Sequence, residues 1–150
     1  MIKNISLTNL LFIGFLVELM IFGFSYIIGE NWGETFRLSA RYSGRLSLVV
    51  YLVSFYHFTF SFIKKKPEKK LKESIIIFCF LHYIHFIYLT LAVYLNDIPI
   101  IPYRLTGGFI AYLMILIYPL IISKIRKLVY HLIYFYYVGI IMAVTILARV

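Results

Sequence analysis

The stretch SIIIFCFLHYIHFIYLTLAVYL, residues 74–95, decides the fold of this chain, because it contains no charged residue from end to end. A helix needs about 20 consecutive apolar residues to cross the hydrocarbon core of a bilayer. In lipid only a helix or a closed barrel satisfies the backbone hydrogen bonds. The stretch lacks the alternation of polar and apolar residues that is typical of barrel strands. It therefore predicts a transmembrane helix.

Four other apolar runs surround this stretch. The five runs cover roughly residues 5–29, 44–63, 74–95, 105–123 and 128–148. The 150 residues are 63% hydrophobic and 14% charged, whereas soluble domains average about half apolar and about a quarter charged. The sequence thus predicts an all-α, polytopic membrane helix bundle with five transmembrane helices. It forms a single domain over residues 1–150, with the lipid bilayer around it.

The distribution of basic residues predicts the topology. Lys3, KKKPEKKLKE (64–73) and SKIRK (123–127) hold most of the lysines and arginines, and all three fall on one side of the five spans. Because loops rich in Lys and Arg stay in the cytoplasm, we expect a cytoplasmic N-terminus and an external C-terminus. The net charge of +9 then reflects topology, and nucleic acid is not an expected partner. From the size and the lack of a targeting segment we expect a bacterial inner membrane.

Two sets of charges lie apart from these loops. Arg37, Arg41 and Arg45 recur every four residues, so they share one face of a helix. They serve either as a lead-in that reaches lipid headgroups, which we favour, or as an anion site for a substrate, a partner or a cofactor carboxylate. Glu18 lies near the middle of the first run. An ionisable group at that depth is costly and marks a functional site, or it is a protonated carboxyl hydrogen-bonded to a tyrosine.

The four histidines of the chain fall within three of the predicted helices; they are His57, His82, His85 and His131. Counted from the basic loops at 1.5 Å per residue, they start roughly 6–14 Å from the cytoplasmic ends, with His85 one turn deeper than His82. The sequence therefore predicts one layer of imidazoles in the inner half to the middle of the bilayer. Such a layer suits a cofactor or a proton path, whereas any one histidine alone is explained by a hydrogen bond between helices.

Haem b is the metal cofactor that best fits such a layer, because imidazoles on facing helices bind the iron from both sides. Other transition-metal sites usually add carboxylate or thiolate ligands, and only Glu18 and Cys79 are available within the runs. A di-iron centre, which needs several glutamates, is not supported. The candidate metal ligands are His82, His85 and His131, with His57 as a further cofactor contact.

Several short motifs extend this interpretation. They are GRLSL (44–48), YIHFIYL (83–89), YRLTGGFIAYLMILIYPLIIS (103–123) and KIRKLVYHLIY (124–134). In order and character they resemble the ferric-reductase-like transmembrane domain, a family that includes NADPH oxidases and the haem-bearing membrane subunit of a bacterial methionine sulfoxide reductase system. The resemblance covers about residues 44–140 and implies that His85 and His131 are haem ligands. It also implies electron transfer with a quinone or a separate redox protein.

The chain departs from the family in its ligand pattern. The family often places a second ligand near the other end of a ligand helix, but at that spacing neither His85 nor His131 has a second histidine. The shared depth suggests instead that His131 pairs with His82 or with His57 around one haem. We therefore expect a b-type cytochrome-like membrane protein. The alternatives are a membrane subunit or scaffold that has lost haem, and a proton-linked transporter that uses Glu18 and the histidines.

Overall fold

The computed structural model describes the backbone of residues 6–63, 69–99 and 101–147, and the side chains of these ranges except at positions 103, 104 and 146. In this part of the chain every regular element is an α-helix and no strand is present, which confirms the all-α prediction. In chain order the helices are α1 (Leu7–Ile28), α2 (Trp32–Ile63), α3 (Lys69–Leu95), α4 (Pro102–Ile121) and α5 (Leu128–Leu147).

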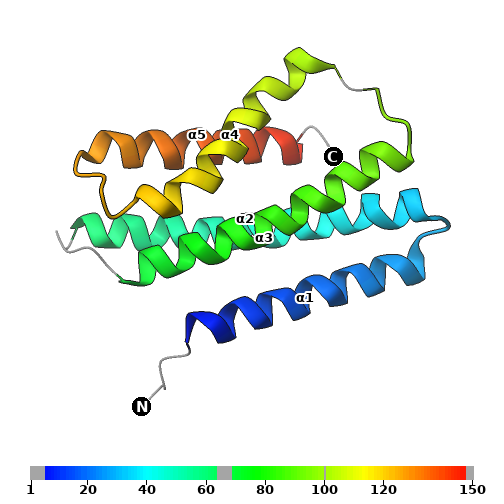
Figure 1. Ribbon diagram of the computed structural model, residues 1–150, viewed down its shortest axis with the longest axis horizontal. Coiled ribbons are helices and arrows are strands. Elements are labelled where there is room, and N and C mark those ends of the chain that lie inside the picture. Colours follow the sequence, from blue (N-terminus) through cyan, green and yellow to red (C-terminus); the bar gives the residue numbers. More distant parts are fainter. Residues whose placement is uncertain (1–5, 64–68, 100, 148–150) are drawn as a thin grey trace.

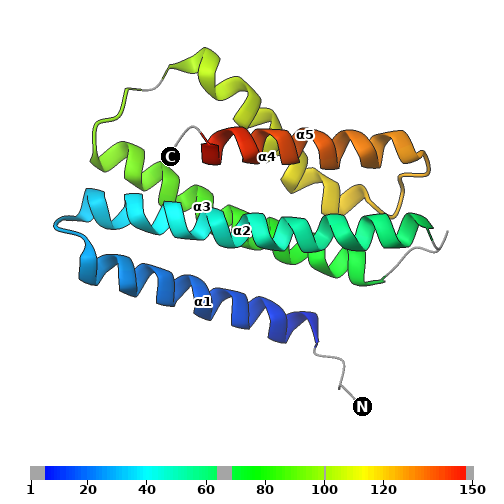
Figure 2. The same ribbon diagram turned by 180° about the vertical axis from the view of Figure 1, so that it is seen from behind.

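Helices α2 and α3 form an antiparallel pair at the centre of the bundle (Figure 1). Helix α1 packs on one side of this pair, whereas α4 and α5 lie on the other side, as the reverse view also shows (Figure 2). Each helix runs opposite to the one before it, so the bundle has two ends. We call the end where α3 and α5 begin the lysine end, and the end with the α1–α2 turn the arginine end.

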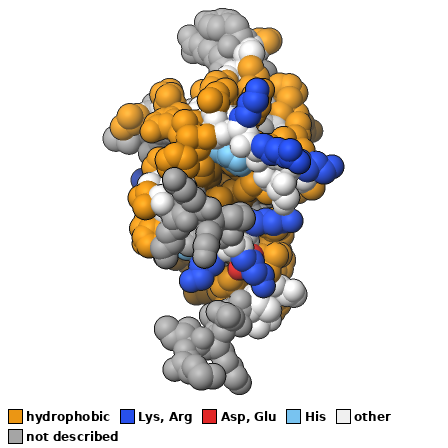
Figure 3. Space-filling view, turned by 90° about the vertical axis from the view of Figure 1, so that its left-hand side faces the viewer, with side chains coloured by type: hydrophobic (Ala, Val, Ile, Leu, Met, Phe, Trp, Pro, Cys, Tyr) orange, Lys and Arg blue, Asp and Glu red, His pale blue; other side chains and the backbone are white. Residues whose placement is uncertain are grey.

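The lysine end carries six described basic residues, whereas α2 carries its arginines toward the other end. Figure 3 shows Lys and Arg side chains around the lysine end. These residues are Lys69, Lys70, Lys72, Lys124, Arg126 and Lys127. Their grouping follows from the alternating direction of the helices, because it places the start of α3 and the link before α5 at the same end.

Four of the five helices contain a stretch long and apolar enough to cross a bilayer; these are α1, α2, α3 and the part Leu128–Thr145 of α5. The described apolar part of α4, Leu105–Ile121, is shorter. Large apolar side chains such as Met20, Ile27 and Leu120 remain exposed, and soluble proteins rarely expose large contiguous apolar areas. The structure thus supports a membrane protein with four candidate spans, and a crossing by α4 stays a prediction.

Helix α2 begins earlier than hydropathy predicts, at Trp32 rather than at residue 44. Its start is capped by Asn31, whose Oδ1 accepts a hydrogen bond of 2.9 Å from the backbone N–H of Glu34, as Asn commonly does at a helix N-terminus. The next turns are polar on two opposite faces, with small hydroxyl residues on the buried face and arginines on the exposed face. Hydropathy alone finds only the apolar part of this helix, because neither of these two faces is apolar.

The buried side of this first half of α2 includes a row of four hydroxyl residues, Thr35, Ser39, Ser43 and Ser47, which we call the serine face. Its members are four residues apart, so they lie above one another on the helix. Small side chains in membrane helices let neighbouring backbones approach closely. At the arginine end the approach is fixed by Asn96, which directly follows α3 and whose Nδ2 donates a 2.9 Å hydrogen bond to the carbonyl oxygen of Gly33.

The lysine-end half of the bundle is filled by an aromatic core. Its largest members are Tyr51, Phe58, Phe78, Tyr118, Tyr134 and Phe135. The rings of Tyr118 and Tyr134 stack with centroids 3.7 Å apart, and those of Phe58 and Phe135 stack at 4.6 Å. Aromatic pairs add to the stability that area burial provides. Helices α2, α3, α4 and α5 therefore meet through rings in this half, not through small polar residues.

Cysteine labelling tests whether α4 crosses the membrane. In a Cys79→Ser background, single substitutions Lys69→Cys and Lys124→Cys are expected to react with an impermeant maleimide from the same side of the membrane. Asp97→Cys, between α3 and α4, is expected to react only from the opposite side. Labelling of positions 97 and 124 from one side would show instead that α4 does not cross.

Substitution of Gly139 tests the packing of α5 on α2. A Cβ at Gly139 would lie 2.5 Å from the hydroxyl oxygen of Tyr51, which donates a hydrogen bond to the carbonyl oxygen of Phe135. Gly139→Ala must displace this hydroxyl and is expected to destabilise the purified protein by about 1–3 kcal/mol. The measurement is the unfolding midpoint in detergent. Gly108→Ala is the control, since its Cβ meets nothing within 4 Å; equal midpoints for the two variants would contradict the packing.

Candidate functional site

Glu18 is buried against α2 and α3 at the middle of α1, with only 1% of its surface exposed. The Ser43 hydroxyl donates a 2.8 Å hydrogen bond to its Oε1, and the Tyr88 hydroxyl donates a 3.3 Å bond to its backbone carbonyl. The second carboxyl oxygen, Oε2, has no hydrogen-bond partner among the described residues. The carboxyl therefore faces the inside of the bundle and keeps one oxygen available.

Two histidines of α3 lie beside this contact, and each is 7% exposed. His85 packs over Gly44, where an added Cβ would lie 3.0 Å from its Cε1. His82 lies one turn away, with its Nδ1 2.7 Å from the hydroxyl oxygen of Ser47. The centroids of the two imidazoles are 5.3 Å apart. Both rings therefore pack against small residues of α2, Gly44 and Ser47, which neighbour Ser43, the partner of Glu18.

These side chains form a group that we call the polar site; its members are Glu18, Ser43, Ser47, His82 and His85. Three helices contribute to it, because α2 repeats serine every four residues and α3 places its two histidines three residues apart, on one face. Within this group, the hydrogen bond of Ser43 joins α2 to α1, and that of Ser47 joins α2 to α3. The serine face of α2, which lets α1 and α3 pack closely on α2, thus also brings the members of the polar site together.

The polar site has different surroundings on its two sides. Toward the lysine end, the His82 ring meets the rings of Phe78 and Tyr112, with centroids 5.3 and 4.9 Å away. Toward the arginine end the serine face continues through Ser39 to Thr35, where Ser39 donates a 2.9 Å hydrogen bond to the Thr35 carbonyl. Thr35 also lines an open hollow of about 610 Å³ at the α1–α2 turn. Buried hydroxyl groups therefore follow one another along α2 between this hollow and the site, and aromatic rings pack on its other side.

The other two histidines lie in the lysine-end half of the bundle. His131 is in the first turns of α5, and its Nδ1 is 2.6 Å from the hydroxyl oxygen of Tyr118. Its ring lies 6.0 Å from that of Phe58, measured between centroids. His57 precedes Phe58 on α2 and is half-buried, with its ring 5.7 Å from that of Tyr56. Neither histidine belongs to the polar site.

The histidines lie at two levels of the bundle rather than in one narrow layer, and their depth in a bilayer stays a prediction. Along α2, His82 is level with Ser47 and His131 is level with Phe58, and these two positions are about 16 Å apart along the helix axis. The sequence estimate measured the depth of His82 from Glu73, but α3 begins at Lys69. Counted from its true start, His82 lies near the middle of the bundle.

The histidines do not fit haem b in this arrangement. A haem held by two imidazoles needs them on opposite sides of the iron, but His82 and His131 are on different levels, and His82 and His85 share one helix. His57 and His131 both lie in the lysine-end half. At the level of His131 the stacked rings of Phe58 and Phe135 fill the space between α2 and α5. Within the described ranges no three His, Cys, Asp or Glu residues are grouped to hold a metal ion. The haem prediction therefore gains no support from the geometry.

The three arginines point away from the polar site. Arg37, Arg41 and Arg45 are exposed on the face of α2 opposite the serine face, because they are offset from it by two residues, or about 200°. Arg37 forms a 3.2 Å ion pair with Glu34. The guanidinium of Arg45 lies 5.8 Å from the ring centroid of Tyr42.

Sequence reasoning found the charged members of the polar site but missed its serines. Serine occurs every four residues in the same helix that carries the arginine repeat, and this regular spacing was the available signal.

No family model matches the chain, and comparison with curated proteins and with solved structures finds no match. The resemblance to the ferric-reductase-like domain therefore stays a prediction from the sequence. A functional conclusion then depends on the polar site itself.

Removal of one hydroxyl tests the contact between Ser47 and His82. Ser47→Ala leaves the buried Nδ1 of His82 without this partner and is expected to lower the free energy of unfolding by about 1–3 kcal/mol. Ser54→Ala is the matched control, because Ser54 is buried in the same helix but donates to the Val50 carbonyl of its own helix. Both are measured by unfolding in detergent. A larger loss in Ser54→Ala would contradict the role of the contact.

Proposed function

We propose that this chain is an integral membrane protein that binds protons at the polar site and relays them across the bilayer. The observation that carries the proposal is the buried carboxyl of Glu18, with one oxygen held by Ser43 and the other without a partner among the described residues. Ionisable groups inside membrane spans are costly and commonly form proton relays of carboxylates and histidines. His82 and His85 supply the imidazoles of such a relay.

The composition of the site favours a proton over other ligands. A calcium ion takes six to eight oxygen ligands, and magnesium requires an octahedral shell, whereas this site offers one carboxyl and two serine hydroxyls. The guanidinium groups of α2 lie on the opposite face, so the site has no fixed cation to bind an anion. A proton needs only one acceptor atom, and both the carboxyl and the imidazoles provide one.

The surroundings of the site suggest the direction of exchange. Hydroxyl groups at Thr35, Ser39 and Ser43 line the way from the hollow at the α1–α2 turn. We therefore expect Glu18 to exchange protons with the arginine end. On the lysine-end side the aromatic core carries the hydroxyl groups of Tyr51, Tyr118 and Tyr134, and these are the groups through which protons would reach that end. A neutral imidazole can accept a proton at one ring nitrogen and release one from the other, so His85 and His82 extend the path beyond the carboxyl.

The second candidate function is a membrane subunit or scaffold without transport. It is favoured by the close packing of the serine face, since Ser43 and Ser47 join three helices. In that case the polar site only holds the helices together, and hydrogen bonds between membrane helices are worth about 0.6–2 kcal/mol each. The two candidates differ in whether protons move.

Proton flux into vesicles tests the proposal. Purified protein is reconstituted with an entrapped pH-sensitive dye, and a potassium gradient with valinomycin supplies the driving potential. Glu18→Gln preserves the side-chain size and an acceptor for Ser43 but removes the titratable group, so the flux is expected to fall to that of protein-free vesicles. Glu73→Gln is the control, because Glu73 pairs with Lys69 at the lysine end and its loss leaves the polar site unchanged.

The infrared spectrum separates proton binding from proton movement. A protonated Glu18 gives a carboxylic C=O band that is absent from Glu18→Gln. Flux equal to that of protein-free vesicles in the unmodified protein would refute the relay and leave the scaffold function.

A further inference from the structure

The arginine face of α2, formed by Arg37, Arg41 and Arg45, is a second surface that the polar site does not use. The three residues are exposed and span about 12 Å along the helix. Within the described part of the chain Arg41 has no ion-pair partner, and Arg37 pairs only with Glu34, three residues before it. An uncovered row of guanidinium groups thus lies along one side of the bundle.

Contacts with α1 fix the depth of this row. The rings of Phe22 and Phe36 lie 5.6 Å apart, and those of Phe24 and Tyr42 lie 6.0 Å apart. Ser43 meets Glu18 at the middle of α1. Arg37 and Arg41 therefore lie level with the second half of α1, and Arg45 lies near its middle. Helix α1 is one of the apolar stretches able to cross a bilayer.

Contacts with α3 give the same depth. Gly33 is bonded to Asn96 and Ser47 to His82, so α2 positions 33 to 47 run beside α3 positions 96 to 82. Helix α3 is apolar over this part up to Leu95. At the level of the arginines, α1 and α3 are therefore both apolar, whereas α2 carries positive charge.

Lipid headgroups do not account for the whole row. Glu18 lies about 15 Å from the end of α1 at Ile28, and Arg41 and Arg45 are near the level of Glu18, because they flank its partner Ser43. A snorkelling side chain covers only part of that distance to the headgroups. An arginine that stays in hydrocarbon needs an anionic partner at its own depth.

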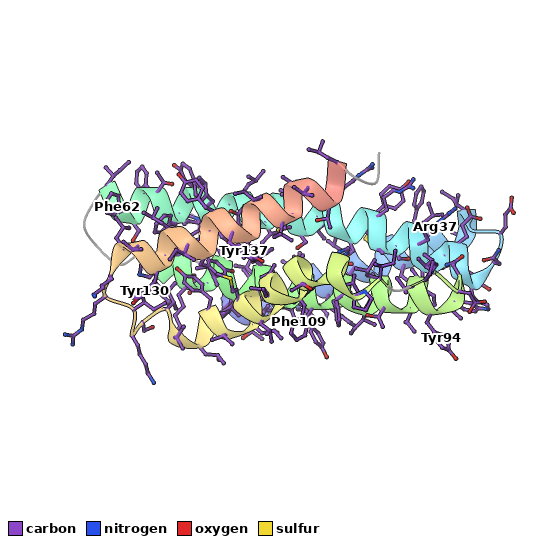
Figure 4. All side chains as sticks on the ribbon, turned by 90° about the horizontal axis from the view of Figure 1, so that it is seen from above. Arg37, Phe62, Tyr94, Phe109, Tyr130 and Tyr137 are labelled. Atoms are coloured by element: carbon purple, nitrogen blue, oxygen red, sulfur yellow. The ribbon has the colours of Figure 1, made fainter. Side chains whose placement is uncertain are left out.

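The rest of the described chain leaves this face open. Helix α5 meets α2 at Tyr51, Phe55 and Phe58, in the lysine-end half. Figure 4 shows Arg37 on α2 beyond the point where α5 ends. Helix α4 packs on α3 and α5. The row is therefore accessible from the membrane.

We infer that the arginine face binds a transmembrane helix of a partner protein that carries carboxylates four residues apart. Asp or Glu at that spacing shares one helix face and matches the spacing of the three guanidinium groups. Arginine suits such a contact, because its planar group binds carboxylates bidentately and stays charged when buried. This inference is independent of the proton relay, since it uses the opposite face of α2.

Energy transfer from Trp32 tests the inference, because Trp32 is the only tryptophan of the chain and precedes the row on α2. The full-length protein is reconstituted in phosphatidylcholine vesicles with a synthetic leucine-rich membrane helix that carries three glutamates four residues apart. A dansyl group at one end of the peptide is the acceptor. At mildly alkaline pH the glutamate peptide is expected to associate about tenfold more tightly than its glutamine counterpart.

Matched variants assign this association to the arginines. The triple variant Arg37→Gln, Arg41→Gln and Arg45→Gln is expected to lose the preference for glutamate. A control triple variant removes the same charge at the lysine end, by Lys69→Gln, Lys70→Gln and Lys72→Gln, and is expected to keep it. Arg41→Glu is expected to weaken binding of the glutamate peptide and to strengthen binding of a lysine peptide, which would show that the altered face is still folded.

Three results would overturn the inference. The first is equal association of the glutamate and glutamine peptides with the unmodified protein. The second is an unchanged glutamate preference in the triple arginine variant. The third is energy transfer from Trp32 to dansyl-labelled phosphatidylglycerol that requires the arginines while the peptide does not associate, because the row would then be a headgroup site.

Discussion

The close approach of α2 to α1 and α3 is the constraint on which the rest of the structure depends. A helix with bulky side chains at positions 39, 43 and 47 could not bring its backbone near both neighbours. With serine there, the carboxyl of α1 and the imidazole of α3 each reach a hydroxyl at 2.8 and 2.7 Å. The same serines supply close helix packing and the hydrogen-bond partners of the polar site. Replacing one of them therefore changes both the stability of the bundle and the polar site.

The bundle is held together in two different ways along its length. Hydroxyls, an amide and a carboxyl join the helices in the arginine-end half. In the lysine-end half the helices meet mainly through stacked rings, with hydrogen bonds made by the hydroxyls of Tyr51 and Tyr118. Hydrogen bonds of this kind have directions and can exchange protons, while an aromatic core excludes water. The boundary between the two lies at His82, which contacts a serine and two aromatic rings.

Local sequence predicted the helices well and their mutual register poorly. The uncharged run 74–95 is found as part of α3, because length and hydropathy are properties of a single helix. The start of α2 at Trp32 was missed, because its first turns are polar on two faces and their mean hydropathy is too low to indicate a membrane span. Glu18 and His82 were identified as candidates, but their serine partners were not. Which residue of α2 faces which residue of α3 depends on packing between helices, and for the same reason the sequence did not reveal that the histidines lie at two levels.

The unequal lengths of the helices have a consequence for the surrounding lipid. Helix α2 has 32 residues and is about 48 Å long, whereas α1 has 22 residues and is about 33 Å long. The hydrocarbon core of a bilayer is about 30 Å thick, and a helix that exceeds it tilts or thickens the lipid beside it. Because α2 packs against both α1 and α3, a tilt of α2 tilts these neighbours with it, so the lipid is ordered differently on the two flanks of the bundle.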